Sequence, residues 1–215
     1  LYAGEEKITK YIDMPLQHIN DRMLKHMHRL GDRAAIESLV ERIRTRIPGV
    51  AFRTAFIVGF PGETDKAFDE LYEFVERSQF DRVAVFLYSD EEGTSAVDLG
   101  EKVGRDIMDE RRNVILAMQE SIAAAKGRAR IGSILDVLVD GRSQESEGVL
   151  EGRHEGLAPE IDGVVYIDED STVATLQPAS EDTVPLLTTG TFCKIKITDA
   201  AAFDLVGRID TNPVF

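Results

Sequence analysis

The stretch Arg53–Thr64, with the sequence RTAFIVGFPGET, most constrains the fold of this chain. The run Phe52–Val58, which begins one residue before this stretch, is apolar and rich in β-branched and aromatic residues. Such a run is typical of a strand buried on both faces in a parallel sheet. Gly59 and Gly62 then predict a sharp turn, and Thr64 can cap a following helix. The stretch therefore predicts a strand, a glycine loop and a helix. The loop lies at the sheet edge where parallel α/β folds bind ligands.

The glycine loop is a poor match to a phosphate-binding P-loop. Glu63 precedes Thr64 at the position where that motif has lysine. A carboxylate there favours an amine, a hydroxyl group or a cation over a phosphate. The simpler alternative is a tight connection that needs glycine for backbone reasons alone.

Strand and helix patterns alternate through residue 130, which predicts βαβ units and a parallel sheet with right-handed crossovers. Further strands are expected at Tyr11–Met14 and Arg82–Tyr88, on either side of the central run. Three strands are too few to close a barrel, and the beginning of the chain reads as truncated. We therefore expect an incomplete barrel.

Helices are expected after the N-capping residues Asn20, Asp32 and Thr64. The first should carry Met23, Leu24, Met27 and Leu30 on its apolar face and stop at Gly31. A long last helix should cover about 105–130, with Ile107, Ile115, Met118 and Ile122 facing inward.

After Gly132 the pattern changes to short β-like runs separated by glycine, proline and acidic turns. They lie near Ile134–Val139, Glu147–Glu151, Val164–Asp168, Thr191–Thr198 and Asp204–Arg208. Five short strands without helical periodicity predict a small all-β barrel of roughly OB-like size. We expect two domains, 1–131 and 132–210.

The net charge of −14 is unevenly spread. Residues 133–210 contain 16 acidic and 5 basic residues, a net charge of −11. A segment this acidic repels nucleic acid and attracts basic partners. Solubility alone is the simpler explanation of such a surface.

Cysteine and hydropathy exclude several classes of protein. Cys193 is the only cysteine, so this chain by itself builds no internal disulfide, iron–sulfur cluster or Cys-rich zinc site. We expect the Cys193 side chain to pack in a core. No apolar run approaches the length of a membrane span, so we expect no membrane association and a cytoplasmic location.

Three consecutive strands should place polar groups at one edge of the sheet. These are Gln17 and His18 after the first strand, Glu63 in the glycine loop, and Tyr88 and Ser89 after the third strand. A single histidine there is more often a helix-start hydrogen-bonding group than a catalyst. Arg53 begins the central strand and needs an anionic partner, either a ligand carboxylate or, more simply, an internal salt bridge.

The remaining histidines have no predicted role in a site. His26 and His28 lie two residues apart on a helix, so they point to different faces and cannot share a metal. His154 lies in a polar sequence, and we expect it to be solvated.

Four stretches resemble the radical S-adenosylmethionine (SAM) methylthiotransferases. In chain order they are Asp13–His18 (DMPLQH), Arg53–Thr64, Phe80–Ser89 (FDRVAVFLYS) with Glu92–Thr94, and Ala158–Gly163 (APEIDG). The last resembles the TRAM domain that ends those enzymes. The resemblance covers nearly the whole chain and implies a partial radical-SAM (β/α) barrel followed by a small all-β TRAM (OB-like) barrel.

The resemblance also implies a SAM site on the glycine loop and its strand. Ile57, Gly59 and Phe60 would line the adenosyl group, and Tyr88 and Ser89 would edge the adenine. Arg53 would be a candidate for the methionyl carboxylate, and Gln17 or His18 for ribose or amino-acid contacts.

The family's C-x-x-x-C-x-x-C motif, which holds the radical-generating cluster, is absent. The resemblance therefore implies the C-terminal part of an enzyme whose two [4Fe-4S] clusters have their ligands elsewhere, and a chain that is inactive alone. Such enzymes also need a sulfur donor, which these residues do not identify.

The residues 79–83 (QFDRV) and the acidic second domain most resemble one branch of the family. That branch methylthiolates the β-carbon of an aspartate in ribosomal protein S-twelve of the small ribosomal subunit. A branch that modifies an adenosine in transfer RNA is the alternative, and a non-catalytic binding module is another.

Overall fold

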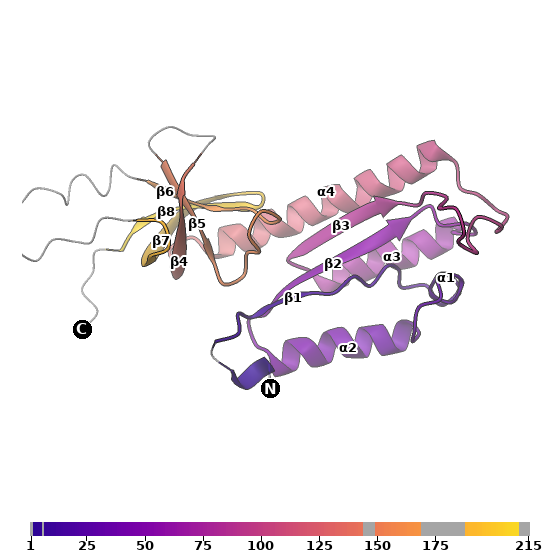
Figure 1. Cartoon of the computed structure of the whole chain (residues 1–215), viewed down its shortest axis with the longest axis horizontal. Coiled ribbons are helices and arrows are strands. Elements are labelled where there is room, and N and C mark those ends of the chain that lie inside the picture. The colour runs from indigo at the N-terminus through magenta and orange to yellow at the C-terminus, as the bar shows by residue number, and fades with distance from the viewer. Residues whose placement is uncertain (1, 6, 144–148, 169–187, 211–215) are drawn as a thin grey trace, which may run out of the picture. The chain divides into compact units, whose positions relative to one another are not determined.

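The computed structural model describes residues 2–5, 7–143, 149–168 and 188–210. The chain divides into two compact units, Leu1–Ile122 and Ala123–Phe215. An α/β arrangement makes up the first unit, and a small barrel makes up the second (Figure 1). Within the described ranges, no helix combines the length and the apolar character needed to cross a membrane.

The first unit contains the predicted parallel sheet. Its three strands, in the order β1-β2-β3, are Tyr11–Asp13, Ala51–Val58 and Arg82–Leu87. Both strand pairs are parallel, and β2 lies in the centre. The expected strand–helix alternation is therefore confirmed.

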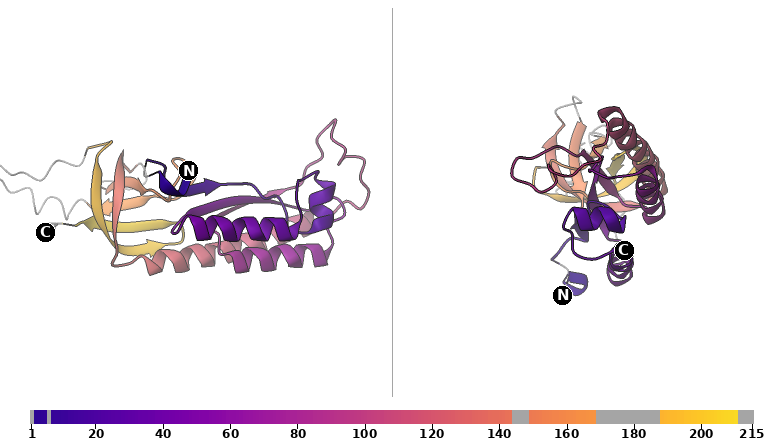
Figure 2. Two further views of the ribbon diagram at one scale, coloured as in Figure 1. Left: turned by 90° about the horizontal axis from the view of Figure 1, so that it is seen from below. Right: turned by 90° about the vertical axis from the view of Figure 1, so that its right-hand side faces the viewer.

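Helices follow the strands as the N-caps predicted. They are α1 (Asp21–His26), α2 (Arg33–Arg46), α3 (Asp65–Ser78) and α4 (Arg105–Ala129), with a short 3-10 turn η1 at Tyr2–Gly4. The side chains of Asn20, Asp32 and Thr64 each accept a hydrogen bond from the backbone N–H three residues ahead. In Figure 1 and in the left view of Figure 2, α2 and α3 run along the strands.

An aromatic cluster forms the centre of the first core. Phe52 and Phe56 of β2 pack with Phe74 of α3 and with Phe80, with ring centroids 5.2–6.3 Å apart. All four side chains are at most 1% exposed. This face of β2 is buried under helices. The other face is only half-buried at Arg53 and Ile57, so the prediction of a strand buried on both faces was wrong in part.

Helix α1 is shorter than predicted. It ends at His26, and Leu30 is 99% exposed instead of buried. His28 adopts the left-handed conformation (φ +53°), while Arg29 N–H donates to Leu24 O and His28 N–H donates to Lys25 O. This is a Schellman termination, in which histidine occupies the position that usually holds glycine.

The inward face of α4 was also predicted with one error. Ile115 and Ile122 are buried and Met118 packs against the first core, but Ile107 is 45% exposed. Ile107 lies in the first turn of the helix, before α4 reaches that core.

The second unit is a closed five-stranded barrel in the order β4-β5-β6-β8-β7. The strands are Ile134–Arg142, Val149–His154, Val165–Asp168, Phe192–Ala201 and Asp204–Ile209. All pairs are antiparallel except the parallel pair of β6 and β8. The predicted all-β barrel is confirmed, although the predicted start of its second strand at Glu147 lies outside the described residues.

The barrel interior is filled by branched side chains such as Val137, Ile167 and Ile195. Cys193 packs partly against this core, and burial raises the pKa of its thiol to about 11. The prediction that His154 is solvated was wrong. It is 8% exposed, and its Nδ1 accepts a hydrogen bond from Gly156 N–H, because β5 turns its last side chain inward.

Candidate functional site

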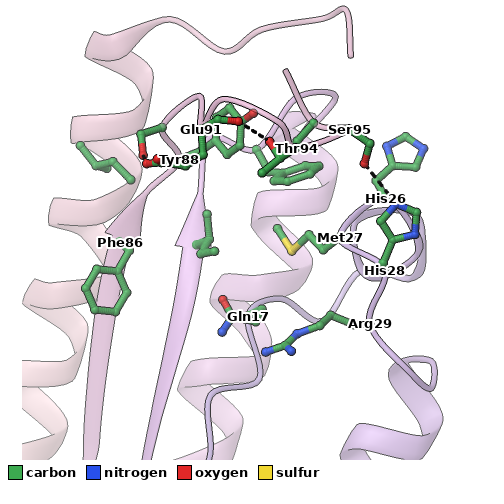
Figure 3. A pocket seen from close by; sticks show the side chains of 15 residues that line it. Gln17, His26, Met27, His28, Arg29, Phe86, Tyr88, Glu91, Thr94 and Ser95 are labelled. Carbon is green, nitrogen blue, oxygen red and sulfur yellow. Dashed lines mark hydrogen bonds between the residues drawn. The ribbon is translucent and has the colours of Figure 1, made fainter. Parts of the chain in front are cut away.

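A cavity of about 590 Å³ opens in the first unit, where β2 and β3 end (Figure 3). This volume is in the range of about 300–1,000 Å³ that is usual for small-molecule sites. Five of the predicted site residues line it: Gln17, Ile57, Phe60, Tyr88 and Ser89. The other lining residues are His26, Met27, His28 and Arg29 after or at the end of α1, Phe86 and Leu87 of β3, and Glu91, Thr94, Ser95 and Ala96 of the following loop.

The backbone of Gln17 continues the sheet beyond β1. Gln17 N–H donates to Ala55 O and Ile57 N–H donates to Gln17 O, each at 2.9 Å. Gln17 also has a positive φ of +72°, so the chain turns away immediately after this pairing. These two bonds place the Gln17 side chain at the end of the sheet, beside Ile57.

The aromatic wall of the cavity joins the glycine loop to β3. The rings of Phe60 and Tyr88 meet edge to face, with centroids 5.0 Å apart. The Tyr88 hydroxyl donates to Asp90 at 2.8 Å, and burial together with this bond raises the pKa of Tyr88. Lys102 lies over the Tyr88 ring and holds the pKa of Asp90 below its usual value. Tyr88 is therefore a neutral side chain with its hydroxyl already engaged.

His18 and Glu63 do not line the cavity. They form a buried polar cluster with Arg111 of α4, behind the glycine loop, in which all three residues are at most 5% exposed. Arg111 Nη1 donates to Glu63 Oε2 at 2.9 Å, and its Nη2 donates to Asp65 at 2.7 Å. Gly59 N–H also donates to Glu63 Oε2. Glu63 is therefore occupied by protein groups.

The hydrogen bonds of His18 determine its tautomer. Its Nδ1 accepts from the backbone N–H groups of Ile19 and Asn20 at 2.9 and 3.0 Å, so Nδ1 carries no proton. Nε2 must then carry it and donate to Glu63 Oε1, 3.1 Å away. His18 is thus neutral, and the buried charges of the cluster are those of Glu63 and Arg111.

Arg53 and Gly59 are the two remaining candidates, and neither lines the cavity. Arg53 donates to Asp13 at 2.5 Å and does not line the cavity, so the simpler salt-bridge interpretation matches the structure. Gly59 has φ +78°, and a Cβ there would collide with Met108 of α4. A direct role of the nine predicted residues in binding a cofactor stays a prediction.

Sequence reasoning missed the end of α1 as part of the site. His26, Met27, His28 and Arg29 reach the cavity because the helix stops early, and His28 Nε2 lies 3.3 Å from Ser95 Oγ. The left-handed residue that ends α1 is a histidine, and no glycine or proline marks that position in the sequence.

The described residues include no group of three or more side chains that could together hold a metal ion. The whole sequence has one cysteine, so the thiolates of a [4Fe-4S] cluster do not come from this chain. The cavity itself does fit a nucleoside-like ligand. It combines apolar walls at Ile57 and Phe60 with polar groups at Gln17 and Ser89.

Two family models match the chain. The radical SAM superfamily model matches residues 3–75, and the TRAM domain model matches residues 131–209. Among solved structures, coproporphyrinogen III oxidase of Escherichia coli, a radical SAM enzyme, aligns with 55% of this chain and 27% of its own. Its TM-score is 0.42 at 20% identity, and the fold assignment rests on the family models instead.

Curated relatives match almost the entire chain. The ribosomal protein uS12 methylthiotransferase RimO of Anaeromyxobacter sp. (strain K) is 45% identical over 207 residues, covering 96% of this chain and 41% of the relative. RimO of Aquifex aeolicus is 42% identical over 206 residues, covering 96% and 44%. The chain spans about two fifths of the length of these relatives. It is therefore a homologue of the RimO methylthiotransferases, with a radical SAM segment followed by a TRAM domain.

Proposed function

We propose that this chain is the C-terminal part of a radical SAM methylthiotransferase that modifies ribosomal protein uS12, the S-twelve protein of the small ribosomal subunit. The reaction would add a methylthio group to the β-carbon of an aspartate. The proposal is supported above all by 45% identity over 207 residues to a RimO methylthiotransferase. We further propose that the domains are residues 1–131 and 132–210.

The first domain would contribute part of a SAM site. Ile57 and Phe60 would contact the adenosyl group, and Gln17 and Ser89 would offer hydrogen bonds to its polar edges. Bound SAM would supply the methyl group of the product. The residues of this chain would bind and orient it, and Phe60 and Tyr88 would exclude water from one side.

The iron–sulfur clusters do not fit this chain. One cysteine, half-buried in the barrel and hydrogen-bonded to Val137 O, cannot supply a cluster site. We propose that the parent enzyme holds two [4Fe-4S] clusters through residues outside this sequence.

The second domain would recognise the basic protein substrate. Its net charge of −11 over residues 133–210 favours a basic protein and disfavours the phosphate backbone of RNA. Acidic side chains such as Asp136 and Asp168 are on the described strands of the barrel.

The test is binding of the chain to purified uS12 and, in parallel, to bulk transfer RNA, each over a salt series. We expect binding to uS12 that weakens as salt increases, and no binding to transfer RNA. RNA binding with a steep salt dependence would instead support the transfer-RNA branch. Binding to neither would contradict a substrate-recognition role for the barrel.

A further inference from the structure

The few basic residues of the barrel gather on one part of its outer surface. Residues 133–210 contain 5 basic residues beside 16 acidic ones. Four of the five alternate along β5, β7 and β8 with more deeply buried positions, so their side chains point outward: Arg153, Lys194, Lys196 and Arg208. Strand β4 lies between β5 and β7, and β7 pairs with β8. These basic side chains therefore share one continuous stretch of the barrel wall.

Two of the four cations lie directly opposite each other. Lys196 and Arg208 are partners in the β7–β8 register, and like charges at directly opposite positions destabilise a sheet. Among the described residues, neither side chain has an ion pair or a hydrogen bond. An acidic residue at either position would remove the repulsion, and acidic residues are abundant in this domain. Keeping the two cations together costs stability, which points to an anionic partner outside the barrel.

Exposed apolar side chains lie beside these cations. Phe192 of β7 is 74% exposed and is the register partner of the outward-pointing Leu138 of β4. Ile134 of β4 is 47% exposed and is the register partner of Lys196. We call this surface the basic–apolar face: Ile134, Leu138, Phe192, Lys196 and Arg208. Exposed aromatic and aliphatic groups next to charged ones are typical of protein–protein interfaces.

The chemistry of the basic–apolar face favours an acidic protein segment over a nucleic acid. Nucleic acids bind through many phosphate contacts at once. This face offers two unpaired cations among its described residues, in a domain with a net charge of −11. Ile134 and Leu138 add aliphatic surface, whereas unstacked bases pack on aromatic rings and guanidinium planes.

The spacing along β7 also suits a protein segment. Residues rise by about 3.3 Å each along a strand, so Phe192 and Lys196 lie about 13 Å apart on the same face. Side chains of an extended peptide have the same spacing. An apolar residue and an acidic residue four positions apart in such a peptide would therefore match Phe192 and Lys196.

We infer that the basic–apolar face binds an acidic protein segment that carries apolar side chains. This goes beyond the proposed function, in which the acidic surface of the same barrel receives the basic protein uS12. The barrel would thus have a second partner, of opposite charge. Because its described strands close into a barrel, binding would use side chains and not addition of a strand to a free edge.

The test is selection of peptides from a random linear library against the full chain, followed by titration of synthetic copies of the selected peptides. The titrations compare the wild type with Lys196→Glu, with Lys196→Glu combined with Arg208→Glu, and with Phe192→Ser. The control combines Arg42→Glu with Arg46→Glu, which reverses two exposed charges of α2. A short single-stranded oligouridine is the nucleic-acid probe.

We expect the selected peptides to be rich in aspartate and glutamate together with leucine, isoleucine or phenylalanine. The double charge reversal and Phe192→Ser should each weaken their binding about 10-fold or more, while the control binds like the wild type.

Thermal unfolding distinguishes a binding role from a structural one. Lys196→Glu alone should raise the midpoint temperature, because it replaces a like-charge pair by an opposite-charge pair. The same substitution should weaken binding of the acidic peptides. A purely structural role of Lys196 predicts no such combination of higher stability and weaker binding.

The inference would be overturned if no acidic peptide is selected, or if the acidic peptides bind the double charge reversal as tightly as the wild type. Binding of oligouridine that is lost in this variant would also overturn it, since the face would then serve nucleic acid. Binding of uS12 should persist in the same variant. Failure of this inference and failure of the proposed function are therefore distinguishable.

Discussion

At the scale of single residues, Gly59 combines two constraints. Its φ of +78° disfavours any side chain, and a Cβ would also collide with Met108. We expect Gly59→Ala to cost about 1–2 kcal/mol for the backbone and roughly 1–3 kcal/mol more for overpacking. The measurement is urea unfolding followed by far-ultraviolet circular dichroism, to which helices α1–α4 contribute.

Gly49 provides the matched control. It has nearly the same φ, +79°, but a Cβ there would meet nothing within 4 Å. Gly49→Ala should therefore show the backbone cost alone. Equal losses in the two variants would mean that Met108 moves aside without cost.

Arg111 stabilises the glycine loop through a buried ion pair. Its side chain is 6% exposed and that of Glu63 is fully buried. Among the described residues, Arg111→Met would leave the Glu63 carboxylate with the Gly59 and His18 donors alone, so we expect a loss of about 3–5 kcal/mol in unfolding free energy. The same unfolding experiment measures it.

Arg105→Met is the comparison for this variant. Arg105 also pairs with a carboxylate on α4, that of Asp109, but its side chain is 69% exposed. Exposed pairs contribute about 0–1 kcal/mol, so this variant should change little. Similar effects of the two substitutions would contradict the role assigned to Arg111.

At the scale of elements, the end of α1 determines the outer wall of the cavity. His28 occupies a left-handed position with φ +53°. We expect His28→Gly to stabilise the unit by about 1 kcal/mol, because glycine adopts this conformation without strain. His28→Ala removes the same contact to Ser95 but keeps the backbone strain. In thermal unfolding, its midpoint temperature should therefore not rise above that of the wild-type chain.

Strand β7 protects the single thiol. Burial raises the pKa of Cys193 to about 11, compared with about 8.5 for an unperturbed thiol. At about pH 9 we expect alkylation to be roughly 50- to 100-fold slower in the folded chain than in guanidinium. Equal rates would show that the thiol is exposed.

The same shift has a defined effect on stability. Because the folded pKa is the higher one, the contribution of Cys193 is fully present below about pH 8.5. It is lost as the pH rises through the folded value of about 11.

At the scale of the whole molecule, the chain should bind SAM only weakly and show no methylthiotransferase activity by itself. One cysteine cannot hold the cluster that the radical SAM family uses beside its cofactor, so under the proposed function part of the SAM site would come from residues outside this sequence. Isothermal titration calorimetry with SAM measures this. One-to-one binding with a Kd of about 1 μM or below would contradict it.

Local sequence patterns were sufficient for most of the fold. The capping residues Asn20, Asp32 and Thr64 act on backbone groups three residues away, and each prediction was confirmed. The parallel order of three strands and the five barrel strands also followed from periodicity and turn residues. These features are local because hydrogen bonding and alternation along a strand or helix involve near neighbours.

The candidate site was predicted only in outline. The prediction that polar and apolar side chains gather at one edge of the sheet was correct for Gln17, Ile57, Phe60, Tyr88 and Ser89, which line one cavity there. The ends of parallel strands meet at that edge. The sequence did not reveal the turn that brings Arg29 into the cavity. That turn is marked by a histidine in the left-handed conformation after α1, which can be recognised only from the backbone of the folded chain.

The sequence by itself therefore determined the fold class, the order of the elements and the sheet edge at which the cavity lies. The tertiary structure decided which charged groups pair with one another. Arg53 pairs with Asp13 across 40 positions, and Arg111 reaches Glu63 across 48. Such partners are chosen by how the chain packs, because burial makes an unpaired charge costly and no local pattern encodes the distance between segments.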